Sequence, residues 1–160
     1  MALDMFLDLT GTKGESVDKV HAGKIDILSW QWGLANSGTF HTGKGGGSGK
    51  SSFQDISITK YIDTATPDLM LYCASGKHFD KGQIIVRKAG DTPVEYLKID
   101  LTKVLVSGYA TGGSGGEERL TERITLNFAE VKVTYAAQTD KGGKGSGPVF
   151  GWDIPGNAKQ

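Results

Sequence analysis

A glycine-rich run offers the first pattern in this sequence that could bind a ligand. Residues 43–51 read GKGGGSGKS, close to the phosphate-binding pattern G-x-x-x-x-G-K-S/T. That loop surrounds phosphate oxygens with backbone N–H groups and leads directly into a helix. The pattern ending at Ser51 needs glycine at position 44, where the chain has Lys44, and the following residues alternate like a strand. We therefore interpret this run as a flexible loop.

A second run, residues 112–116 (GGSGG), matches the nucleophile pattern G-x-S-x-G around Ser114. A nucleophilic serine of this kind sits on a sharp turn between a strand and a helix. The segment that follows is predicted to be another strand, and a GGSGG run matches the pattern by composition alone. We interpret it as a linker.

The remaining reactive side chains form no recognisable set. His21, His41 and His78 share no metal-binding spacing such as H-x-H or H-E-x-x-H. Cys73, the single cysteine, excludes an intramolecular disulfide and is expected to be a buried, inert thiol. We therefore predict no enzymatic activity, no cofactor and no metal.

The composition indicates a single soluble domain. The chain has 160 residues, with 18 basic and 18 acidic residues and a formal net charge of zero. This balance argues against nucleic-acid binding through phosphate neutralisation. No segment reaches the about 20 apolar residues that span a bilayer, so no membrane insertion is expected. The first eight residues carry two acids and no basic region, so we expect no signal peptide and synthesis in the cytoplasm.

The apolar residues mostly alternate with period two, which predicts β-strands. In residues 24–32 and 120–135 the apolar positions change parity, which indicates a bulge or sharp twist of the kind found in barrels. The predicted strands cover residues 3–9, 24–32, 52–61, 83–88, 94–106 and 120–135.

One short helix interrupts the strands. Thr66 is predicted to be its N-cap, Pro67 its first residue and Gly76 its C-cap, with Asp68 complementing the helix dipole. The fold class is therefore all-β, a barrel or sandwich with one short helix.

Two features indicate contact with another chain. Trp30 and Trp32 share one strand face and pack either in the core or at a subunit boundary. The acid-free stretch 36–50 is long for a loop, so it is either disordered or ordered by a neighbour. Strand edges invite pairing with another copy, and a heterologous contact can close into a ring.

Residues matching one known family run in order from position 4 to about 153. On these residues the chain resembles the haemolysin-coregulated proteins (Hcp), the tube subunits of the bacterial type VI secretion system. The matching residues are DMF (4–6) through GES (14–16), His21, LSWQWG (28–33), the glycine-rich loop 43–49, Phe53, TKYID (59–63), SGKH (75–78), RKAG (87–90), EYL (95–97), VLVS (104–107), LNFA (126–129) with Val131 and Tyr135, and GWD (151–153).

The resemblance implies a fold and an assembly. The fold is a two-sheet β-barrel with one short α-helix, and six copies form a ring with a wide channel. Rings stack into a tube inside a contractile sheath, whose contraction expels the tube, and the channel carries and protects effectors. The implied partners are other copies of the chain, type VI effectors, and sheath and spike or baseplate components. The implied location is the bacterial cytoplasm, followed by secretion without a signal peptide.

The resemblance also assigns roles to residues of a single domain, 1–160. Gln31 faces the channel and contacts effectors, while its neighbours Trp30 and Trp32 point into the barrel wall. The stretch 36–50 matches an extended hairpin that reaches a neighbouring subunit or ring, and residues 140–160 form a glycine-rich C-terminal tail without a fused effector domain. The inter-subunit or ring-stacking residues are Gly43, Lys44, Gly45, Gly46, Gly47, Ser48 and Gly49.

Two other functions stay open at this stage. A monomeric β-barrel would bind a small apolar ligand in its interior, and its mass in solution would separate it from a ring. A small hydrolase would use Ser114 or a histidine, and it would lose activity on Ser114→Ala.

Overall fold

The computed structural model describes residues 2–38, 40–43, 48–90, 93–137 and 147–160. These residues are mostly β-strand, with one α-helix and one 3-10 helix, so the predicted class of a β fold with one short helix is confirmed. The strands are β1 Leu3–Leu9, β2 Ile25–Asp26, β3 Ser29–Gln31, β4 Leu34–Gly38, β5 Ser48–Phe53, β6 Ile56–Tyr61, β7 His78–Lys88, β8 Val94–Thr111, β9 Thr121–Tyr135, β10 Val149–Asp153 and β11 Ala158–Lys159. The helices are η1 Phe40–Thr42 and α1 Thr66–Ser75.

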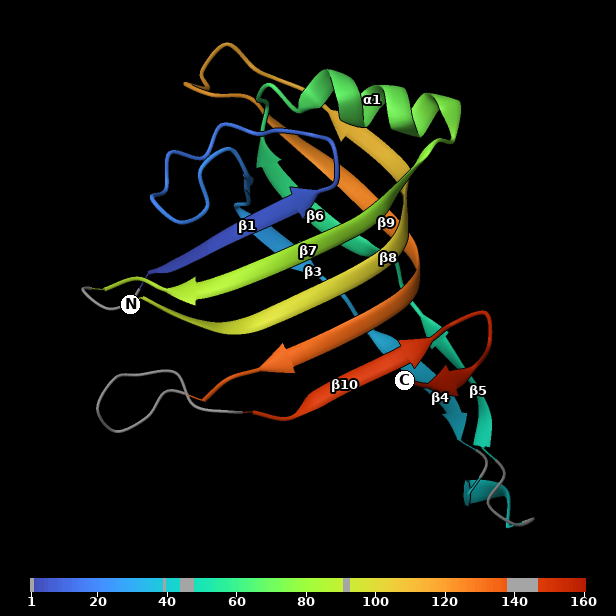
Figure 1. The fold of residues 1–160 in the computed structure, drawn as a ribbon. Helices are drawn as coiled ribbons and strands as arrows, with labels where there is room; N and C mark the ends of the chain where they lie inside the picture. Colours follow the sequence, from blue (N-terminus) through green and yellow to red (C-terminus); the bar gives the residue numbers. More distant parts are fainter. Residues whose placement is uncertain (1, 39, 44–47, 91–92, 138–146) are drawn as a thin grey trace.

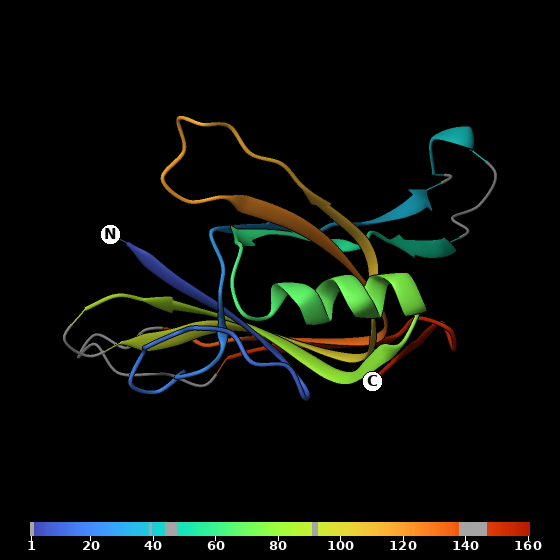
Figure 2. The ribbon, with the colours of Figure 1, turned by 90° about the horizontal axis from the view of Figure 1, so that it is seen from above.

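Nine strands form one branched sheet (Figure 1). Its main path runs β11-β10-β9-β8-β7-β1-β2, and a branch joins β3 to β6 and β6 to β9. The branch and the main path lie as two facing layers, with α1 at one end of the space between them (Figure 2). The separate β4–β5 hairpin projects from this body. The two layers are arms of this one sheet, and the ladders of the described residues do not join β2 to β3.

Strand β9 connects the layers because it has three partners. One edge pairs with β8, and the other edge pairs first with β6 and then with β10. The predicted parity change lies between Phe128 and Val131, where β9 passes from one layer to the other. In β8, Lys103 has a φ of 55° beside this point, a conformation that bends a strand. The predicted twist in residues 120–135 is therefore confirmed.

The parity change in residues 24–32 marks a second crossing between the layers. β2 pairs with β1, whereas β3 pairs with β6, so the single predicted strand was wrong. The crossing occurs between Ile27, whose N–H donates to Met5 O at 3.0 Å, and Leu28, whose N–H donates to Thr59 O at 2.9 Å. The residues before and after this crossing lie in opposite layers, and both segments turn their apolar side chains towards the same core.

The core fills the space between the layers. Its side chains come from every second position of the long strands and from one face of α1, as period-two alternation predicts. The largest fully buried apolar residues of this core are Phe79, Leu7, Leu9, Ile25, Ile56, Ile58, Leu69, Ile84, Ile99 and Leu101.

The start of α1 differs from the prediction by one residue. Ala65 is the N-cap and makes no side-chain cap bond, so the assignment of Thr66 as N-cap was wrong. The Thr66 hydroxyl instead donates to Glu122 Oε1 at 2.8 Å and accepts from Asp63 N at 3.0 Å. The C-cap prediction is confirmed, because Gly76 has a φ of 73° and its N–H donates to Tyr72 O.

A buried charge network attaches α1 to the sheet. Lys60 Nζ is fully buried, bonds to Glu122 and donates to Asp63 Oδ1 at 2.9 Å. Glu122 also accepts from Tyr109 at 2.6 Å. Burial and this hydrogen bond raise the pKa of Tyr109 to about 12. The network joins β6, β8, β9 and the residues before α1 at one point.

We expect Lys60→Met to lower the free energy of unfolding by about 3–5 kcal/mol, because it leaves the Glu122 carboxylate buried without its cation. Adding Glu122→Met should recover part of the loss, since the fully buried carboxylate is then gone and only Asp63 still lacks the Lys60 cation. Urea denaturation at fixed protein concentration measures both effects. Lys132→Met, at an exposed site on β9, is the matched control and should change the free energy by at most about 0.5 kcal/mol. A loss below about 1 kcal/mol for Lys60→Met would contradict this account of the network.

Candidate functional site

Gln31 lies on the exposed face of β3. Trp30 and Trp32, on either side of it, are half-buried and pack against the core. The Trp32 indole N–H also donates to Gln54 O at 3.0 Å. The predicted alternation, with both tryptophans inward and Gln31 outward, is confirmed.

Strand pairing places small polar side chains beside Gln31. The partners of β3 on β6 and of β6 on β9 form two rows across three strands. One row is Gln31, Ser57 and Thr125, and the next is Ser29, Thr59 and Arg123. Opposite residues in adjacent strands lie about 4.5–5.5 Å apart, so each row is a continuous polar surface.

Arg123 is the charged member of these two rows. It is exposed, and among the described residues it makes no ion pair. Beyond the rows, the Asp55 carboxylate accepts hydrogen bonds from Ser107 at 2.6 Å and Asn127 at 2.9 Å. The surface can donate and accept hydrogen bonds, so it suits contact with water and polar surfaces.

Sequence reasoning identified Gln31 but missed its neighbours, because they come from strands far along the chain. The alternation of β9 contained a usable signal, since the buried residues Ile124 and Leu126 place Arg123 and Thr125 on the outward side. The alternation does not reveal that β9 pairs with β6.

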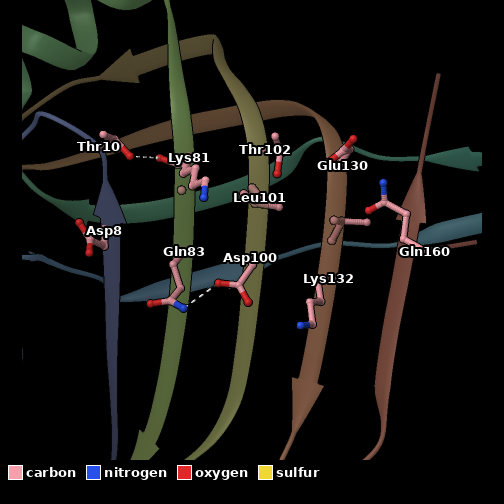
Figure 3. A pocket seen from close by; sticks show the side chains of 12 residues that line it. Asp8, Thr10, Lys81, Gln83, Asp100, Leu101, Thr102, Glu130, Lys132 and Gln160 are labelled. Atoms are coloured by element: carbon pink, nitrogen blue, oxygen red, sulfur yellow. Dashed lines mark hydrogen bonds between the residues drawn. The ribbon is translucent and has the colours of Figure 1, made fainter. Parts of the chain in front are cut away.

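The outward face of the other layer is charged instead (Figure 3). Asp8, Gln83, Asp100 and Lys132 form one row across β1, β7, β8 and β9. Gln83 donates to Asp100 at 2.7 Å. The row crosses a shallow hollow of about 530 Å³ that Lys81, among others, also lines. The face therefore carries charges of both signs, two carboxylates and a lysine in this row, which keep it hydrated.

The β4–β5 hairpin carries the predicted inter-subunit residues that the structure describes. Gly43 follows η1 with a φ of 70°, and Ser48 begins β5 opposite Gly38. Gly49 packs against Ser37, where a Cβ would lie 2.1 Å from the hydroxyl oxygen. The remaining predicted residues lie outside the described residues and are Lys44, Gly45, Gly46 and Gly47.

The resemblance implied a hairpin over 36–50, and residues 36–38 lie in β4 and 48–50 in β5, where sequence patterning alone indicated a loop. One prediction is corrected, because β5 and β6 replace the single strand expected over 52–61. At the tip, Phe40 is 83% exposed. The interpretation of 43–51 as a phosphate loop is excluded by its context, since β5 follows the glycines where a helix is needed. At the other end of the chain, Val149 begins β10, so part of the predicted tail belongs to the main sheet.

The described residues contain no arrangement suited to catalysis or to a metal. Ser114 is exposed in the turn between β8 and β9, not between a strand and a helix. His21 is buried, whereas His41 and His78 are exposed in other elements, and no group of three or more metal-ligating side chains gathers in the described part of the chain. Cys73 is half-buried rather than buried. Within the same residues, no helix has the length and apolar content to cross a bilayer.

The loop between β1 and β2, residues 10–24, is fastened to the sheet by charges. Arg87 on β7 bonds to both Asp18 in the loop and Asp4 on β1. The Arg87 hydrogen bond holds the pKa of the Asp18 carboxyl well below its usual range, and the N–H groups of Val20 and His21 act in the same direction. The pKa of the Arg87 guanidinium is raised in return.

A second contact fixes the end of this loop. Lys24 Nζ lies 2.8 Å from His21 Nδ1, and a lysine ammonium can only donate, so the His21 ring proton is on Nε2. His21 Nε2 donates this proton to Glu95 Oε1, which lies 2.6 Å from the nitrogen. Burial raises the pKa of Glu95, but hydrogen bonds from Lys98 and His21 outweigh it and leave the pKa below its usual value.

Comparison with known proteins consistently finds proteins of type VI secretion systems. Residues 6–135 match the family model described as "Type VI secretion system effector, Hcp". The protein hcp1 of Pseudomonas aeruginosa is 55% identical over 161 residues, covering 99% of both chains. A solved structure of a type six secretion system protein has a TM-score of 0.94 and 28% identity, covering 99% of this chain and 100% of that one. Hcp1 from Salmonella typhimurium has a TM-score of 0.84 and 37% identity, with full coverage of both chains.

The Arg87–Asp18 contact predicts a definite pH dependence. Because the folded state depresses the pKa of Asp18, the stabilisation is complete above the unfolded pKa of about 3.9 and is lost as pH falls towards the folded value. We expect Arg87→Gln to lower the melting temperature equally at pH 7 and pH 5, and the difference from the unmodified chain to shrink below about pH 4. Circular dichroism melts measure this. Lys132→Gln is the control for loss of an exposed charge, and a difference for Arg87→Gln that stays constant to pH 2 would contradict the assignment.

Proposed function

This chain belongs to the Hcp family of type VI secretion proteins, and from that premise we propose that six copies close into a ring and that rings stack into a tube. Members of this family are structural tube and effector proteins rather than enzymes, and the same holds for this chain. The ring, its stacking and its cargo are the parts that the proposal adds.

The observation that carries the proposal is a four-stranded arm with two unpaired edges. In the order β3-β6-β9-β8, β3 pairs only with β6, and β8 beyond Leu105 pairs only with β9 among the described residues. Free edges with unmet N–H and C=O groups accept a strand from another chain. The two edges differ, so pairing is head to tail, and such a contact closes into a ring when the rotation allows.

The size of such a ring follows from strand spacing. Six arms of four strands place about 24 strands side by side at about 4.8 Å each, a circumference of about 115 Å and a diameter of about 37 Å. Strand tilt widens it further. A ring of this width keeps a water-filled bore after side chains are added, consistent with the small polar rows around Gln31.

We assign the Gln31 face to the channel wall and the charged face of Figure 3 to the outside of the tube. Effectors inside the bore then meet Gln31 and Arg123, which offer hydrogen bonds and positive charge in every copy. The charged outer face meets the sheath, while spike or baseplate components meet the tube end. The location that follows is the bacterial cytoplasm first and the outside after tube expulsion.

The alternative of a monomer with an internal apolar ligand has less support. Large side chains such as Phe79, Leu69 and Ile58 fill the space between the layers and are fully buried. A ligand cavity would need some of that volume.

Native mass spectrometry and electron micrographs test the proposal. We expect a particle of six times the 17.0 kDa chain mass, seen end-on as a ring. A lone chain at every concentration and buffer would overturn it.

Shortening the hairpin separates stacking from folding. We expect deletion of residues 43–49 to leave the melting temperature and ring mass nearly unchanged, because the hairpin projects from the body and lies outside the core. Tubes in electron micrographs should become shorter or disappear. The matched control shortens the β8–β9 turn by residues 112–116, which also removes glycines from a projecting turn. Equal losses of stability and stacking in the hairpin variant would argue against a stacking role.

A further inference from the structure

Two valines stand out on the loop between β1 and β2. Val17 is 97% exposed and Val20 is 69% exposed. Single apolar side chains on a surface are ordinary. Val17 and Val20, however, lie three residues apart on one rigid loop, and we call this pair the knob. Because the loop is already ordered, the knob loses little conformational entropy when it contacts another surface.

The loop is rigid at the position of the valines themselves. Asp18, between them, accepts hydrogen bonds from the N–H groups of Val20 and His21, each at 3.0 Å, and from Arg87 on β7. Ser16 Oγ accepts from Asp18 N at 3.2 Å. The backbone that presents both valines is therefore tied to the sheet.

Backbone hydrogen bonds also join the two segments at the base of the loop. Ser16 N donates to Lys24 O at 2.9 Å, and Gly14 N donates to Gly23 O at 2.8 Å. A Cβ at Gly14 would lie 2.5 Å from Lys24 O, so only glycine permits this approach. The two segments at the base of the loop are therefore joined by hydrogen bonds, and Val17 and Val20 lie between them in the chain.

An apolar groove lies at the opposite end of the molecule. It has a volume of about 260 Å³ between the hairpin and β10. Its apolar walls are Leu34, Phe53, Phe150 and Trp152, of which Leu34 is 51% and Phe150 38% exposed. The loop and the β4, β5 and β10 walls of the groove lie at opposite ends in both views (Figures 1 and 2).

We propose that Val17 and Val20 of one copy dock into the groove of a second copy in the next ring. Knob and groove lie at opposite ends of one chain, so they cannot meet within it, and a contact between them repeats from copy to copy in one direction. The rim of the groove carries Asn36, Ser51 and Asn157, uncharged groups that leave room for Lys19 to stay hydrated between the valines. The inference rests on the proposed stacking of rings and names the side chains that perform it.

Cross-linking tests the contact directly. In a Cys73→Ser background, Val20→Cys combined with Leu34→Cys gives every chain one cysteine in the knob and one in the groove. After mild oxidation of tubes, we expect a ladder of linked chains longer than two on a non-reducing gel. Either cysteine alone should give no ladder. Tubes that form normally while the double variant yields no ladder would overturn the proposal.

Removing the knob tests its contribution. We expect Val17→Ser with Val20→Ser to leave the ring mass and melting temperature unchanged, because both side chains are exposed. The protein concentration needed for tubes should rise at least about tenfold, since the lost contact recurs in every copy. Val17→Ile with Val20→Ile keeps the knob apolar and should retain tubes.

The outcomes separate this inference from the function it rests on. If the unmodified chain forms no rings, the proposed function fails. If rings and tubes form and the double serine variant assembles as well as the unmodified chain, only the knob and groove fail. A groove that binds anilinonaphthalene sulfonate equally in rings and in tubes would indicate a small apolar ligand there and would also overturn the inference.

Discussion

The fold depends on strand β9, because one of its edges is shared between two partner strands. A strand has two edges and can hold three partners only when one edge is shared along its length. β9 gives one edge to β8 and divides the other between β6 and β10. The two partners diverge at the bend near Ala129, so the sheet separates into two layers with the core between them. Because the outward face of each layer is set by the same alternation, a single bend produces two outer surfaces of different chemistry.

Two charge networks hold the parts that the sheet alone does not position, and they differ physically. Lys60 and Glu122 are buried, so removing either one leaves an unpaired buried charge, which lowers the free energy of unfolding. Arg87 is buried, but Asp18 is partly exposed, so water weakens this pair more than it weakens Lys60 and Glu122. Their contribution is geometric, because one guanidinium contacts the loop and β1 together. The first network sets the place of α1, and the second sets the shape of the β1–β2 loop.

Much of this fold could be read from the sequence where alternation is strong. The bounds of β1, the parity changes in β9 and around Ile27, and the cap at Gly76 were all predicted. The hairpin was expected only from the family resemblance, because β5 begins with Ser48-Gly49-Lys50, which has no apolar alternation to indicate a strand. Thr66 was misassigned because its hydroxyl bonds to Glu122, 56 residues away. The neighbours of Gln31 depend on strand pairing, and pairing between distant strands leaves no local pattern.

The contrast between the two outer surfaces explains how a protein without a reactive site can still be specific. On one face, Ser57, Thr59 and Thr125 are short and uncharged and Arg123 is the single charge in their two rows, so a passing surface meets mostly hydrogen bonds that exchange easily with water. On the other face, Asp8, Asp100 and Lys132 fix a pattern of charge that favours one complementary partner and repels others. A ring built with the first face inward would release its cargo readily and hold its outer partner in register. The chemistry needed for both properties is present in one folded sheet, and the repetition of copies supplies the strength that each contact lacks.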